Sequence, residues 1–156
     1  MSWRQPRAYA TLARVRRPAT GRLNSGVRRH NMFPHEAEDW ASAFIAFQQD
    51  PDRLRDGHPL FWAATRFMLP GEYAIAEDCW ETILVILSRQ PPDSVIGVLA
   101  AGPLEDLIHY AGPQFIDRIE SEARRNPAFR DLLGGVWECS TPDVWTRVEA
   151  ARGDSW

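Results

Sequence analysis

Titratable side chains that could do chemistry gather between residues 105 and 120. This stretch contains Glu105, Asp106, His109, Asp117 and Glu120. Glu105 and His109 are four residues apart, so a helix would place both on one face, where a carboxylate and an imidazole can share a metal ion or transfer protons. Glu120 would complete this set if it lay on a neighbouring, antiparallel helix. These residues are therefore the catalytic candidates for a metal- or carboxylate-dependent hydrolase.

A structural interpretation of the same residues competes with the catalytic one, and we favour it. Leu104, Leu107 and Ile108 form an apolar stripe that would face the core. Glu105 and His109 then fall on the polar side of an amphipathic helix. Glu105 also lies in the expected first turn, where an acidic side chain is stabilised by the helix dipole.

Two arginines form a second candidate site, for binding. Arg124 and Arg130 flank the corner Asn126-Pro127, with Glu120 and Asp131 nearby in the sequence. Two guanidinium groups at one corner could bind a phosphate or another anion. Each arginine also has an acid within helical reach, and Glu120 and Arg124 have the i, i+4 spacing of an ion pair. The sequence therefore favours an ion-pair network between two helices over an anion site.

Several enzyme classes lack their motifs. The chain has no lysine, which excludes Schiff-base chemistry and a P-loop. GxSxG, HExxH, CxxC and GxGxxG are absent, and Cys79 and Cys139 are too far apart for a metal-ligand motif. We expect no metal and no cofactor, and an enzyme is the less favoured class without being excluded. Trp137 and Trp145 could stack on a ring, but their apolar neighbours predict that both are core residues.

The elements that must position these residues are predicted to be helices throughout. Apolar side chains recur at intervals of three and four residues, and no convincing strand pattern occurs. Gly102-Pro103 and Gly112-Pro113 are typical of a helix end followed by a helix start. Asn126-Pro127 and Thr141-Pro142 are typical of helix starts, and Gly134-Gly135 of a helix stop. The second helix, over residues 59–69, is apolar around most of its circumference and is predicted to be the most buried. We expect an all-α fold, an irregular orthogonal bundle of about seven to eight short helices.

Charge divides the chain into unequal parts. The first 35 residues contain eight arginines and no acid, whereas the remaining 121 contain ten arginines and 21 acids, a net charge of −11. We expect residues 1–31 to be a disordered extension, 32–152 a single helical domain and 153–156 a tail. The extension could be a nucleic-acid-binding arm or a transit peptide. We favour a third interpretation, that the annotated start lies too far upstream and translation begins at Met32.

The stretch from residue 99 to 137 carries a family resemblance. The pattern GPLEDL, followed by IE..AR..P.FR..LGGVW, resembles an uncharacterised bacterial family, a domain of unknown function. The resemblance covers about residues 36–152. It implies a small, helical, cytoplasmic bacterial protein, and it supplies no activity and no catalytic residue.

Three functional hypotheses follow. The favoured one is a protein-interaction module, an adaptor or an immunity or antitoxin-like protein, because a net charge of −11 after residue 35 would suit a basic protein partner. The second is the hydrolase that uses Glu105, His109 and Glu120. The third is a nucleic-acid-associated protein, which depends on residues 1–31 being genuine. A membrane-spanning protein is not expected, because no apolar run approaches 18 residues.

Overall fold

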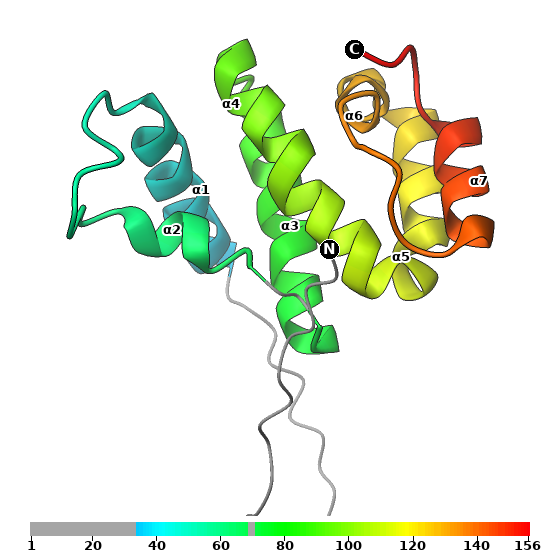
Figure 1. Ribbon diagram of the computed structural model, residues 1–156, viewed down its shortest axis with the longest axis horizontal. Helices are drawn as coiled ribbons and strands as arrows, with labels where there is room; N and C mark the ends of the chain where they lie inside the picture. Colours follow the sequence, from blue (N-terminus) through cyan, green and yellow to red (C-terminus); the bar gives the residue numbers. More distant parts are fainter. Residues whose placement is uncertain (1–33, 69–70) are drawn as a thin grey trace, which may run out of the picture.

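The computed structural model describes residues 34–68 and 71–156, so the predictions for residues 1–31 lie outside the described part. Every regular element there is a helix, which confirms the all-α class (Figure 1). In chain order the elements are α1 (Pro34–Gln49), α2 (Phe61–Thr65), α3 (Tyr73–Ser88), α4 (Asp93–Leu99), the π-helical turn η1 (Ala100–Leu104), α5 (Glu105–Arg125), α6 (Pro127–Leu133) and α7 (Pro142–Ala151).

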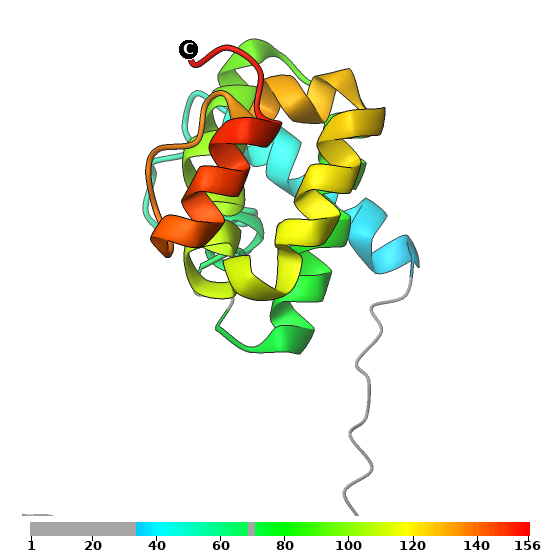
Figure 2. The same ribbon diagram turned by 90° about the vertical axis from the view of Figure 1, so that its right-hand side faces the viewer.

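The elements α4, η1 and α5 follow one another without a break. The prediction that Gly102-Pro103 and Gly112-Pro113 each end a helix is therefore wrong, and the described part has six separate helices where seven to eight were expected. Pro103 lies in η1, where the wider π turn accommodates a residue that lacks a backbone donor. Pro113 lies inside α5. A proline bends a helix without having to end it, and the second half of α5 turns back beside α7 (Figure 2).

One hydrophobic core joins all of these elements. The apolar stripes predicted for α1, α3 and α5 are buried, which confirms their helical phase; they include Trp40, Phe44, Trp80, Ile83, Phe115 and Ile119. Trp80 is buried, with its ring centroid 5.9 Å from that of Phe115 and 5.5 Å from that of Phe129. Large aromatic side chains therefore connect α3, α5 and α6.

The second helix is not the most buried one. It is shorter than predicted, and Phe61, Trp62 and Met68 are 52%, 43% and 58% exposed. Among the described residues of this segment, 59–68, only Ala63 and Phe67 are buried. The helix α2 packs on α1, where the Trp40 indole N–H donates to the Ala63 carbonyl at 2.7 Å. Phe61, Trp62 and Met68 therefore lie on the side of this segment that no other described residue buries.

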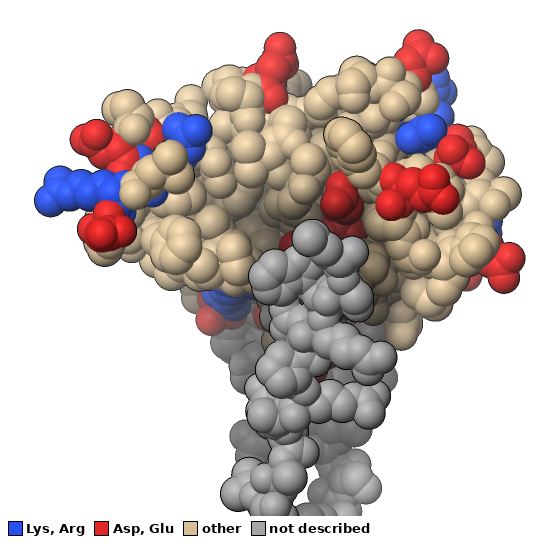
Figure 3. Space-filling view, in the orientation of Figure 1, with Lys and Arg blue, Asp and Glu red and all other residues tan. Residues whose placement is uncertain are grey.

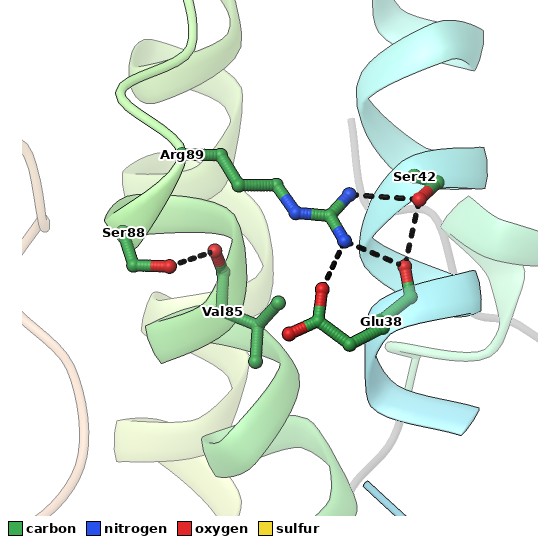
Figure 4. Close-up of polar contacts among 5 residues, drawn as sticks. All are labelled: Glu38, Ser42, Val85, Ser88 and Arg89. Carbon is green, nitrogen blue, oxygen red and sulfur yellow. Dashed lines mark hydrogen bonds and ion pairs between the residues drawn. The ribbon is translucent and has the colours of Figure 1, made fainter. Parts of the chain in front are cut away.

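Polar contacts fix the neighbours of α3. Arg89, at its C-terminal end, donates to the Ser42 hydroxyl at 2.8 Å and to the Glu38 carbonyl at 3.0 Å, and it also pairs with the Glu38 carboxylate (Figure 4). On another side, Arg118 of α5 donates to the Glu77 carboxylate at 2.7 Å. These contacts orient α1 and α5 on α3.

Within the described residues, no helix combines the length and the apolar character that crossing a membrane requires.

Candidate functional site

The first half of α5 carries Glu105, Asp106 and His109. The Glu105 carboxylate accepts a hydrogen bond from the Trp137 backbone amide at 3.2 Å, and its carbonyl accepts one from the Cys139 thiol at 3.8 Å. Glu105 therefore anchors the segment between α6 and α7. Partial burial raises the pKa of Asp106, and the nearby His109 partly offsets this. His109 is exposed, and its ring lies edge-on to Tyr110.

The second half of α5 carries Asp117 and Glu120, which both bind Arg147 of α7. Arg147 donates to the two Glu120 carboxylate oxygens at 2.8 Å each and to Asp117 at 2.6 Å. The hydrogen bonds from Arg147 lower the pKa of Glu120, and those to Glu120 and Asp117 raise the pKa of Arg147. Through these contacts Arg147 holds α7 on α5.

The catalytic candidates thus form two groups with different partners. Glu105, His109 and Glu120 all lie on α5, where the sequence predicted two antiparallel helices. The described ranges, 34–68 and 71–156, contain no group of three or more His, Cys, Asp or Glu side chains that could hold a metal ion.

The arginine candidates lie at a groove between α5, α6 and α7. The predicted pair between Arg124 and Glu120 does not form, because Glu120 binds Arg147. Among the described residues, no carboxylate lies within 4 Å of the guanidinium of Arg124 or Arg130. The groove has a volume of about 460 Å³, and its lining consists of Glu120, Ala123, Arg124, Arg130, Arg147, Ala150, Ala151 and Arg152. The predicted ion-pair network is therefore absent at these two arginines.

A second groove contains two exposed tryptophans, one that the sequence predicts to be a core residue and one, Trp156, that sequence reasoning missed. Trp145 is buried as predicted, but Trp137 is 76% exposed, so its prediction as a core residue is wrong. Trp137 and Trp156, itself 63% exposed, line a groove of about 370 Å³ together with Gly134, Gly135 and Glu138. Trp137 follows the last turn of α6 in an irregular segment, where helical spacing does not predict which side chains face inward.

The C-terminal segment positions Trp156. Gly153 N–H donates to the Arg130 carbonyl at 3.2 Å, and Trp156 N–H donates to the Gly134 carbonyl at 3.3 Å. The Trp156 indole N–H donates to the Asp131 carbonyl at 2.9 Å. A Cβ on Gly135 would lie 2.6 Å from the Trp156 ring, so this glycine permits the ring to approach. Gly134-Gly135, which the sequence indicates as a helix stop, thus also serves as a packing surface.

A family model described as "Family of unknown function (DUF6869)" matches residues 35–155. No curated protein and no solved structure matches the chain. The resemblance to a domain of unknown function is thereby confirmed.

Proposed function

We propose, for a chain that belongs to the DUF6869 family of unknown function, that it is a protein-interaction domain whose contact surface is the groove of Trp137 and Trp156. The observation that carries this proposal is the exposure of two tryptophans on one groove. Single exposed apolar residues are common on protein surfaces. Two exposed tryptophans on one groove indicate an interface instead, because tryptophan is enriched among the residues that dominate binding energy at interfaces.

The construction of the groove also suits an interface. Trp156 is held by two hydrogen bonds, and the backbone amide of Trp137 itself donates to the Glu105 carboxylate. A fixed side chain loses little conformational entropy on binding, so more of the contact energy appears as affinity. These hydrogen bonds support a binding surface that is already ordered before a partner binds.

The charge around the groove indicates the chemistry of the partner. Glu138 and Glu149 line the groove with Arg152, and Arg152 pairs with Glu149 at 3.4 Å. Figure 3 shows acidic side chains over the part of this face where α6, α7 and the segment between them lie. We therefore expect a protein that inserts an apolar side chain next to a lysine or arginine, in line with the net charge of −11 after residue 35.

A capture experiment with matched tryptophan variants tests this function. The full chain is used as bait in the native host, as wild type, Trp137→Ala and Trp62→Ala. Trp62 is 43% exposed and lies on α2, so it controls for the loss of a surface tryptophan. We expect one stoichiometric partner that Trp137→Ala loses and Trp62→Ala retains.

Binding of the purified pair, measured by calorimetry, then gives the size of the effect. Trp137→Ala should weaken the affinity by at least about 30-fold, as for an interface residue worth roughly 2 kcal/mol. Repeated recovery of no stoichiometric partner would count against an interaction domain. Equal affinities of the wild type and Trp137→Ala for a recovered partner would remove the groove from the proposal.

A further inference from the structure

The groove between α5, α6 and α7 is a concentration of positive charge in an acidic molecule. Four arginines and one glutamate line it. Asp117 and Glu149 lie beside it and bind Arg147 and Arg152, so Arg124 and Arg130 are the two lining arginines with no ion pair among the described residues. The rest of the chain after residue 35 is strongly acidic. We propose that this groove binds a small phosphorylated molecule, with Arg124 and Arg130 holding its phosphate group.

The four arginines of the groove fall into two pairs with different partners. Arg147 is engaged by Glu120 and Asp117, and Arg152 is engaged by Glu149 and lies over the Trp145 ring. These two arginines hold α7 in place. Arg124 and Arg130 have no carboxylate of the described residues within 4 Å, although both face the same groove. Their donors are therefore available to an external anion.

Glu120 pairs with Arg147 of α7 and not with Arg124 on its own helix. Had Glu120 bound Arg124, the groove would be neutral on its α5 side. Arg147 instead binds Glu120 through both carboxylate oxygens, which neutralises the one acid in the lining. A guanidinium that is free of intramolecular acids can bind phosphate through two parallel N–H donors.

The volume and the lining of the groove indicate the size of ligand that it can hold. A volume of about 460 Å³ lies in the range typical of small-molecule pockets. Ala123, Ala150 and Ala151 supply the apolar part of the lining. This combination suits a phosphate attached to a small organic group, which the alanines would contact while the arginines bind the phosphate.

A structural role for the same arginines makes a different prediction. Arg124 and Arg130 lie in the last turns of α5 and α6, where a cation offsets the partial negative charge of the helix end. That role affects folding stability and requires no ligand. Binding and stability must therefore be measured separately on the same variants.

The test is an NMR titration of the full chain with inorganic phosphate, phenyl phosphate and acetate at constant ionic strength. The variant pair is Arg124→Gln/Arg130→Gln. Its matched control is Arg53→Gln/Arg55→Gln, which removes the same charge at another hollow, of about 360 Å³, between α1 and α2. We expect saturable shifts in α5, α6 and α7 with phenyl phosphate, which should bind more tightly than inorganic phosphate and far more tightly than acetate.

The groove double variant should lose at least about tenfold in affinity, the effect of about one charge-assisted hydrogen bond, while the control should change by less than about twofold. Equal losses in both double variants would mean general charge attraction and would overturn the proposal. Acetate binding as tightly as either phosphate would overturn the ligand class. Phenyl phosphate binding no more tightly than inorganic phosphate would overturn the organic part.

A variant that fails to fold does not leave the proposal untested. Arg124→Lys/Arg130→Lys keeps both charges at the helix ends and removes the planar fork. We expect unchanged thermal unfolding and weaker phenyl phosphate binding from this variant. Shifts in the wild type that map away from α5, α6 and α7 would overturn the site without any variant.

Discussion

A single arginine, Arg147, is the ion-pair partner of two candidate residues, Glu120 and Asp117. It binds Glu120 and Asp117 across the interface of α5 and α7, from 27 and 30 residues away in the sequence. The spacing of Glu120 and Arg124 predicts a local pair, yet the tertiary contact prevails. A bidentate guanidinium–carboxylate contact has better geometry than a flexible pair along one helix surface.

Replacing Glu120 should change how stability depends on pH. Because the pKa of Glu120 is lowered in the folded state, its contribution is fully present above the unfolded value of about 4.5. That contribution is lost as the pH falls through the lower, folded value. Glu120→Gln should cost up to about 1 kcal/mol at pH 7, the range of surface ion pairs, and should flatten the acid limb of the stability curve.

Urea unfolding from pH 7 down to pH 3 measures this effect. Glu81→Gln on α3 is the control, because Glu81 is exposed and has no ion pair within the described residues. An acid limb equally steep in Glu120→Gln and in the wild type would contradict the assignment.

At the scale of elements, two glycines that precede prolines differ in their surroundings. A Cβ on Gly102 would have nothing within 4 Å, whereas a Cβ on Gly112 would lie 2.8 Å from the Ser140 hydroxyl and 2.9 Å from a Val144 methyl. Gly102 thus lies in a continuous helix with open space beside it. Gly112 allows α5 to approach the start of α7. The two Gly-Pro pairs look alike in the sequence, but only Gly112 is required for close packing against another helix.

Alanine at the two glycines should have opposite effects. Gly102→Ala should stabilise the chain by about 0.5–1 kcal/mol, because alanine loses less backbone entropy in a helix. Gly112→Ala should destabilise it by about 1–3 kcal/mol through overpacking. Urea midpoints with unchanged m-values measure both. Destabilisation by Gly102→Ala would contradict the position of Gly102 inside a continuous helix with open space beside it.

At the scale of the whole molecule, the C-terminal segment closes the structure over α6. Three hydrogen bonds join it to the carbonyls of Arg130, Asp131 and Gly134. A Cβ on Gly134 would lie 2.2 Å from the Asp154 carbonyl, so this packing requires glycine. Residues 153–156, which the sequence predicts to be a tail, therefore contribute one wall of the groove that contains Trp137 and Trp156.

Deleting residues 153–156 should lower the free energy of unfolding by about 2 kcal/mol, at about 1 kcal/mol per net hydrogen bond less the entropy regained by the segment. It should also raise the hydrogen-exchange rates of α6 amides above those of α3. Trp156→Phe, which loses the indole donor and keeps a ring, should lie between the deletion and the wild type. Identical thermal unfolding of the deletion variant and the wild type would show that the segment contributes nothing.

The sequence alone determined which faces of the helices are buried and where two helices begin. Phe44, Ile83 and Phe115 lie in the core because the helix period places them there. Asn126 accepts from the Phe129 amide at 3.3 Å and Thr141 from the Val144 amide at 3.4 Å, as N-cap residues do. Both kinds of prediction depend on residues within one or two turns.

Only the tertiary structure decided the exposure of Trp137, the partner of Glu120 and the continuity of the helix through Pro103 and Pro113. Each depends on what packs against the residue from a distant part of the chain. A proline can end a helix or bend it, and packing on neighbouring helices selects between these outcomes. The sequence names Glu120, Arg124 and Arg130 as candidates, whereas their meeting at one groove, and the groove of Trp137 and Trp156, come only from the tertiary structure.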